Sequence, residues 1–396
     1  MEKQKWWKTG FIMSTFEATG HLEMADLEDC KRRVEVTRDA GYDIIEITWK
    51  TPSTTETILA ACDELNIPVI LEDPFAGGKM CPAIRERNAE SVSLLLDAYK
   101  KYKSCIKGIY IFDEPMLQHF DECAEMQQAL KEIDEEILPF FALVPSYGPY
   151  TFKNGQYPTY VNDFISKIDP EVISFDYYCF WQHCIKNPIN RNPLWKDMGF
   201  WRLKSIETQK PFWWYFQGIN FGPKVPENES HLVITPAHWS VQMYTGLAFN
   251  AKGLSCYNSY GSILDLEGNK THLYDDICVL NRKVKLMGEK LYNAKPLAIY
   301  HTGLRPQEEK EYFADAYENN PYFSSDTKAI LVSCFEENGK KMFLVLNKCY
   351  KKGKNVAINL KGKNVHSFDS DIKLKKTFDE IKFYLPAGGA ALLVEE

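Results

Sequence analysis

The sequence predicts a (β/α)8 TIM barrel followed by a small antiparallel β-sandwich. Eight apolar, strand-like runs each precede a helical stretch in the first two-thirds of the chain. Many of these runs are nearly continuous in apolar residues, as expected for strands that helices cover. Eight such units in about 290 residues match a barrel. A doubly wound open sheet is the alternative, but it usually has fewer strands and often a glycine-rich first turn, which this sequence lacks.

The strands and helices of the predicted barrel alternate along the chain. We expect strands at 9–16, 42–49, 67–74, 108–115, 138–146, 171–181, 210–219 and 251–261. We expect helices at 26–41, 51–66, 83–104, 118–134, 159–169, 195–209, 235–250 and 271–294. Residues that cap or begin helices stand at several of the helix starts, namely Asp26, Thr51–Pro52 and Thr235–Pro236.

The pattern changes after about residue 296, where short strands are separated by turn residues. Asn338-Gly339 lies between two apolar runs and predicts a tight hairpin. We therefore expect a barrel domain at 1–295 and a β-sandwich domain at 296–396. The second domain carries no His/Asp/Glu cluster that looks catalytic, so we expect it to be a lid or a scaffold.

Composition and charge exclude several classes of function. The net charge of −7 disfavours a nucleic-acid partner, which would need a basic face. No apolar run approaches the roughly 20 residues that span a bilayer, so no membrane partner is expected. The first ten residues lack the apolar core of a secretory signal, which indicates a cytoplasmic protein or one whose signal has been removed. The 11 cysteines are scattered without a CxxC pair, and they favour a reducing compartment. The sequence does not predict the oligomeric state.

Candidate site residues lie where the predicted strands end, because barrel active sites form at the carboxyl ends of the strands. The candidates are the following side chains: Glu46, Trp49, Glu72, Asp113, Glu114, Asp176, Tyr178, Trp214, Gln217, Asn258 and Tyr260. This set of carboxylates, amides and aromatic rings, with few cations, suits a neutral polyhydroxylated ligand such as a carbohydrate. A phosphate would call for a glycine-rich turn, arginine or lysine. We expect neither a metal nor a cofactor.

The adjacent acids Asp113 and Glu114 end the fourth predicted strand and are the strongest catalytic candidates. Two carboxylates that share a site do not both ionise easily, so the pKa of one rises toward the value that a general acid needs near neutral pH. In a regular strand the two side chains would point in opposite directions. Both reach one site only if the strand ends or bulges there, and Pro115 makes that plausible.

A strand-four ending of the type [Asn/Asp]-Glu-Pro on an eightfold barrel with a C-terminal β domain resembles the clan A type glycoside hydrolases. The stretch Pro-Ala-Gly-Gly-Ala-Ala-Leu-Leu near the C-terminus looks like the last strand of such β domains. The resemblance implies that Glu114 is the general acid/base. It also implies that Asp113 positions the substrate or tunes the acidity of the Glu114 proton. One departure stands at the seventh strand, where Gln217 occupies the place of the expected nucleophilic Glu. An amide cannot form the glycosyl-enzyme ester.

Three interpretations of this departure remain open. In the first interpretation, the second catalytic carboxylate comes from Glu46, Glu72 or Asp176. In the second, catalysis is substrate-assisted, as in the β-N-acetylhexosaminidases that the Asp-Glu-Pro motif also resembles. That resemblance implies that Asp113 orients the 2-acetamido group, and that Tyr178, Trp214 and Gln217 hold the sugar. In the third, the protein binds sugar without cleaving it.

A metal-dependent isomerase is the alternative from a different class of function. The phrase AGYDIIEI resembles the second strand of xylose-isomerase-like barrels, which bind divalent metal through Glu, Asp and His. However, His183 is the only histidine near the predicted strand ends.

Overall fold

The computed structural model describes residues 5–16, 23, 26–48, 50–75, 80–148, 156–180, 193–219, 234–377 and 380–396. Eight parallel strands form the first sheet, and their bounds are β1 Ile12–Thr15, β2 Ile44–Ile47, β3 Val69–Leu71, β4 Ile106–Asp113, β5 Leu138–Ala142, β6 Ile173–Asp176, β7 Phe212–Gln217 and β8 Gly253–Tyr257. Seven of these strands are shorter than the run that predicted them, and β4 has the predicted length but begins two residues earlier.

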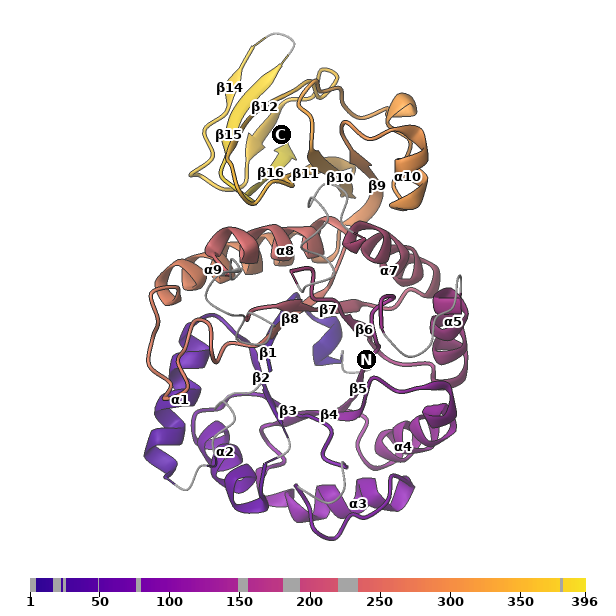
Figure 1. The fold of residues 1–396 in the computed structure, drawn as a ribbon, viewed down its shortest axis with the longest axis vertical. Helices are drawn as coiled ribbons and strands as arrows, with labels where there is room; N and C mark the ends of the chain where they lie inside the picture. Colours follow the sequence, from indigo (N-terminus) through magenta and orange to yellow (C-terminus); the bar gives the residue numbers. More distant parts are fainter. Residues whose placement is uncertain are drawn as a thin grey trace, which may run out of the picture. The chain divides into compact units, whose positions relative to one another are not determined.

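The sheet closes on itself as a barrel. The strand order is β5-β4-β3-β2-β1-β8-β7-β6, and a parallel bridge between Leu143 and Phe175 joins the two ends. The Leu143 amide donates to the Ser174 carbonyl at 3.0 Å, and the Asp176 amide donates to the Leu143 carbonyl at 3.2 Å. Figure 1 shows the strands as a ring with α1 to α5 around it. The predicted (β/α)8 barrel is confirmed.

The helices follow the strands in the predicted alternation. The α-helices of this part of the chain are α1 Leu27–Asp39, α2 Pro52–Glu64, α3 Ala89–Ala98, α4 Phe120–Ile133, α5 Gln156–Ile168, α7 Leu194–Thr208, α8 Pro236–Ala248 and α9 Tyr274–Tyr292. The predicted cap Asp26 accepts from the amides of Glu28 and Asp29, and the Thr51 hydroxyl accepts from the Thr54 amide. Among the described residues, no helix has the length and apolar character needed to cross a bilayer.

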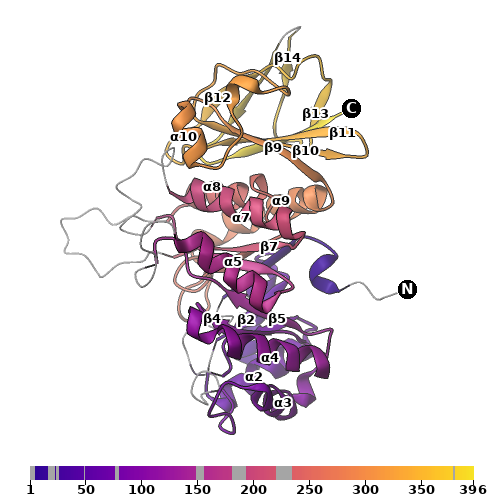
Figure 2. The same cartoon turned by 90° about the vertical axis from the view of Figure 1, so that its right-hand side faces the viewer.

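A short helix, η1 (Trp6–Lys8), lies against the amino-terminal ends of the barrel strands. The Trp6 indole donates to the Lys107 carbonyl near the start of β4 at 3.1 Å, and its ring centroid is 6.2 Å from that of Trp213 near the start of β7. Figure 2 shows this indigo helix, near the N label, at one end of the barrel strands. The side chains described below lie at the opposite, carboxyl-terminal ends.

The chain after the barrel forms two antiparallel sheets. The first has the order β13-β16-β11-β10-β9, and the second has the order β12-β15-β14. Their strands are β9 Lys295–His301, β10 Ile330–Glu337, β11 Lys340–Asn347, β12 Lys354–Ile358, β13 Val365–Ser367, β14 Lys375–Lys376, β15 Ile381–Leu385 and β16 Ala390–Glu395. Between β9 and β10 lie α10 (Pro306–Glu311) and η5 (Tyr317–Asn319). The predicted Asn338-Gly339 hairpin turn joins β10 to β11, with φ of 53° and 79° at its two residues.

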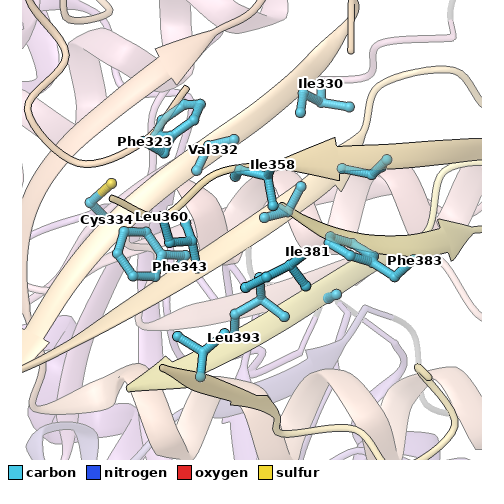
Figure 3. Packing of buried hydrophobic residues seen from close by; sticks show 14 of the residues in the cluster. Phe323, Ile330, Val332, Cys334, Phe343, Ile358, Leu360, Ile381, Phe383 and Leu393 are labelled. Carbon is cyan, nitrogen blue, oxygen red and sulfur yellow. The ribbon is translucent and has the colours of Figure 1, made fainter. Parts of the chain in front are cut away.

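The two sheets share one apolar core, as the predicted β-sandwich requires. Strands β12 and β15 contribute Val356, Ile358 and Phe383 to a cluster that also contains Val332 and Phe343 of the larger sheet. Figure 3 shows Val332, Phe343, Ile358 and Phe383 of this cluster packed together. Figure 2 shows the same sheets from the side.

Contacts between residues divide the chain into two compact units. The first comprises Met1–Tyr177, Lys210–Ile219 and Gly253–Cys278, and it holds all eight barrel strands. The second comprises Tyr178–Gln209, Asn220–Lys252 and Val279–Glu396, so that α7 and α8 are grouped with the C-terminal sheets. Within the second unit, the Ser333 hydroxyl of β10 donates to the Ala248 carbonyl at the end of α8 at 2.6 Å. The predicted domain boundary between residues 295 and 296 stays a prediction.

Candidate active site

The end of β4 brings two acidic side chains to the carboxyl-terminal end of the barrel. The pairing of β4 with β5 is interrupted by a register shift between Tyr110 and Phe112. Glu114 then takes a left-handed conformation with φ of 50°, while its amide still donates to the Ala142 carbonyl at 2.9 Å. Because positive φ is uncommon for a residue other than glycine, this turn marks a specific departure from the regular strand. Both residues keep exposed surface, although surrounding protein atoms partly withdraw their carboxyl groups from water.

The electrostatic environment separates Asp113 from Glu114. Partial burial, followed by the nearby negative charge of Asp113, raises the pKa of Glu114 to about 7. Burial also raises the pKa of Asp113, but the Tyr110 hydroxyl and the Arg87 guanidinium act in the opposite direction. The Asp113 charge thus helps to raise the pKa of Glu114 toward the value that a general acid needs, while Tyr110 and Arg87 favour the charged form of Asp113.

A hydrogen-bonded network lies in the barrel interior beneath these acids. The Tyr110 hydroxyl donates to Oδ1 of Asp113 at 3.1 Å. Across the barrel, the Tyr215 hydroxyl donates to Oε2 of Glu46 at 2.6 Å, and the Ser255 hydroxyl donates to Oε1 at 3.1 Å. The Glu46 side chain is completely buried, and burial raises its pKa. Both of its oxygens are therefore engaged inside the protein, away from solvent.

An ion pair between the buried Asp73 and the half-buried Arg87 lies beside β3 and β4. The Arg87 guanidinium donates to both carboxylate oxygens of Asp73, at 2.7 and 2.9 Å, and lies 3.7 Å from the centre of the Phe112 ring. Burial raises the pKa of Asp73 to about 6 even though Arg87 acts to lower it. Because Arg87 also lowers the pKa of Asp113, it links this pair to the acids at the end of β4.

Four other predicted site residues lie at the same ends of the strands. Glu72 follows β3, is buried, and acts electrostatically on Tyr110 and Tyr215. Asp176 ends β6 and is half-buried. Gln217 ends β7 and donates to the Ile219 carbonyl at 2.9 Å, and the buried Asn258 follows β8.

The remaining predicted residues are placed differently. Trp214 is fully buried on the outer face of β7, where its indole donates to the Tyr177 carbonyl at 3.3 Å. Tyr260 is 3% exposed, and its hydroxyl lies beside Arg33 and Thr37 of α1. Neither position favours the predicted binding of substrate. Tyr178 is half-buried in the second unit, and Trp49 lies outside the described residues.

Four residues of this site are absent from the candidates named above. Tyr110, Tyr215, Ser255 and Arg87 complete the contacts of the acids, but the first two lie in apolar runs that read as core. The hydroxyl-bearing Ser255 in an otherwise apolar strand was a usable signal, because a buried polar side chain needs a partner. Arg87 lies far from any predicted strand end.

The metal-dependent alternative gains no support from the donor geometry. Among the residues that the structure describes, no three His, Cys, Asp or Glu side chains converge as a metal ion would require. His183 lies outside those residues. The absence of a metal and a cofactor stays a prediction.

The fold is similar to that of several solved structures. They include a catalytic mutant of a GH42 β-galactosidase from G. stearothermophilus, with 8% identity, 98% coverage of both chains and a TM-score of 0.62. An α-amylase from Geobacillus thermoleovorans has 10% identity, covers 100% of this chain and 99% of its own, and has a TM-score of 0.58. An Anoxybacillus α-amylase has 10% identity, 99% coverage of both chains and the same score. At these identities the likeness concerns the fold. No protein-family model matches the sequence, and no curated protein matches it.

Proposed function

We propose that this protein is a glycoside hydrolase in which Glu114 is the general acid/base and Asp113 is its functional partner. Its substrate is a carbohydrate, either an oligosaccharide or a glycoconjugate. The observation that carries the proposal is the end of β4, where an exposed Glu114 with a pKa of about 7 stands beside Asp113. The solved structures of similar fold named above, a β-galactosidase and two α-amylases, support the same class of activity.

Glu114 supplies the proton that the leaving group needs. The neutral carboxyl donates its proton to the glycosidic oxygen while the bond from that oxygen to the anomeric carbon breaks. The resulting carboxylate then takes a proton from the attacking water, which restores the neutral acid. A pKa near the working pH suits both steps, because the group must give and accept a proton within one turnover.

Asp113 supports a substrate-assisted reaction on 2-acetamido sugars. In that reaction the acetamido oxygen forms a bond to the anomeric carbon as the glycosidic bond breaks, and the Asp113 carboxylate accepts the hydrogen bond of the acetamido N–H. Water then opens the cyclic intermediate. This route needs no carboxylate at Gln217. Glu46 is a weaker candidate for the second carboxylate, because it is completely buried and both its oxygens accept hydrogen bonds.

The proposal is tested with a panel of aryl glycosides and oligosaccharides. We expect hydrolysis of at least one glycoside and faster turnover of aryl β-N-acetylhexosaminides than of the matching plain hexosides. Turnover of plain hexosides alone would remove the substrate-assisted route but keep the glycosidase. Sugar binding without hydrolysis of any member of the panel would contradict the proposed enzyme and favour the binding-only interpretation.

A further inference from the structure

We infer that Tyr110 is a positioning residue that fixes the orientation of the Asp113 carboxylate in the active site. Its hydroxyl donates to Oδ1 of Asp113 at 3.1 Å. The functional part of this inference rests on the proposed glycoside hydrolysis, but the contact itself does not.

The register shift in β4 is what makes the contact between Tyr110 and Asp113 possible. In a regular strand, residues three apart lie on opposite faces of the sheet, because side chains alternate with a period of two. The pairing with β5 skips one residue of β4 between Tyr110 and Phe112. One extra residue in a strand restores the same face to side chains three apart. The bulge therefore turns a position predicted to be core into a partner of Asp113.

The Tyr110 ring is held in place by the barrel interior. Tyr110 is 2% exposed, its ring centroid lies 5.3 Å from that of Phe140, and it stacks on Tyr215 at 6.4 Å with 15° between the planes. Tyr215 is in turn fixed by its 2.6 Å hydrogen bond to Glu46. A ring packed on two sides cannot swing away from Asp113 without displacing these neighbours.

The surrounding charges keep Tyr110 as a donor. Burial and the carboxylates of Asp113, Glu72 and Glu46 raise the pKa of its phenol well above the ordinary value. The hydroxyl therefore stays protonated, and its bond to Asp113 favours the ionised carboxylate.

The test compares Tyr110→Phe with a matched control, Tyr157→Phe. Tyr157→Phe also removes a buried hydrogen bond, which the Tyr157 hydroxyl donates to the Val144 carbonyl at 3.0 Å rather than to Asp113. The proteins are labelled with 13C at the aspartate carboxyl carbon, and the Asp113 resonance is assigned with Asp113→Asn. We expect Tyr110→Phe to raise the Asp113 midpoint by roughly one pH unit, because a donor to a charged group is lost. The control should leave that midpoint unchanged.

The wild-type protein gives a second reading that does not depend on a variant folding. The 13Cζ resonance of Tyr110 should move at the same pH at which Asp113 titrates, because its hydroxyl bonds to that carboxylate. The inference would be overturned if Asp113 titrated identically in wild type and in Tyr110→Phe. It would also be overturned if the chemical shift of the Tyr110 13Cζ resonance did not change at the pH at which Asp113 titrates.

Activity measurements separate this inference from the proposed function. If glycosides are hydrolysed, Tyr110→Phe should shift the midpoint of the acidic limb of the pH profile of kcat/KM to higher pH by a similar amount. A merely structural role of Tyr110 would lower activity without shifting that midpoint. If no glycoside is hydrolysed, the proposed function fails, while the two titrations still decide whether Tyr110 holds Asp113.

Discussion

The Tyr215 hydroxyl donates a 2.6 Å hydrogen bond to Oε2 of Glu46, although 169 residues separate the two in the chain. This bond crosses the barrel from β7 to β2 and fixes which side chains of β7 point inward. Tyr215 and Gln217 share the inner face because side chains alternate along a strand, and Trp214 therefore lies on the outer face. The relationship also explains why a completely buried Glu46 is tolerated, since each of its oxygens has a donor.

Glu46→Gln should change how stability depends on pH. The folded pKa of Glu46 is raised by burial, so its contribution to stability is fully present below the ordinary pKa of 4.5 and is lost as pH rises toward the folded pKa. The Glu46→Gln variant does not lose stability in this way, because an amide does not ionise. Denaturant unfolding from pH 4 to 8 should show the difference between variant and wild type shifting in favour of the variant, by up to about 1.4 kcal/mol per pH unit. A pH-independent difference would contradict this assignment.

Arg87→Gln should destabilise the barrel more at pH 8 than at pH 5. Asp73 has a pKa of about 6, so at pH 8 the variant leaves a buried carboxylate without its cation, whereas at pH 5 the carboxyl is largely protonated. We expect a loss of about 3 kcal/mol at the higher pH, measured by urea unfolding. Arg85→Gln, which changes an exposed arginine, is the control. Adding Asp73→Asn should recover part of the loss, and an equal loss at both pH values would refute the charge argument.

Lys348→Met should remove a pH-dependent loss of folding stability in the second unit. The Lys348 amine is completely buried, lies 3.0 Å from Nδ1 of His301, and has its pKa lowered to about 7 by burial. Its contribution to stability is present above the ordinary pKa of 10.5 and falls as pH drops toward 7, by about 1.4 kcal/mol per unit.

The stability of Lys348→Met relative to wild type should therefore be highest near pH 7 and should decline toward pH 10. Thermal unfolding at pH 7 and 9.5 measures this change, with the exposed Lys352→Met as control. A difference that does not change between the two pH values would contradict the lowered pKa.

The pH dependence of activity should reflect Glu114. The general acid must be protonated, and the pKa of Glu114 is about 7, so kcat/KM on an unactivated glycoside should fall as pH rises through about 7. Steady-state rates between pH 5 and 9 measure this limb. A rate that stays constant from pH 6 to 9 would show that another group supplies the proton.

The sequence predicted the barrel and the position of its acids well, because both depend on local patterns. Apolar runs ending in Glu46, Glu72, Asp113 and Asp176 follow the strand period and the rule that barrel chemistry lies at strand ends. Pro115 correctly signalled that β4 is interrupted near Asp113 and Glu114.

Which side chains of a strand face the barrel interior could not be predicted from the sequence. In β7 every residue is buried, so the composition of FWWYFQ does not tell the inner face from the outer one, and only the partner Glu46 on β2 decides it. The role of Tyr110 depends on a bulge whose location comes from pairing with β5. Tyr260 lies beside α1 because of a tertiary contact, which no local pattern encodes.

The central claim is that Glu114 protonates the leaving group, and the hydrolysis rate of Glu114→Gln tests it most directly. The variant is compared with wild type and with Glu125→Gln, the same change on the exposed face of α4, using one glycoside with a poor leaving group and one with an activated aryl group. The account predicts a loss of roughly 100-fold to 10,000-fold on the poor leaving group, a smaller loss on the activated one, and no loss in the control. A folded Glu114→Gln protein that hydrolyses the unactivated glycoside at the wild-type rate would contradict it.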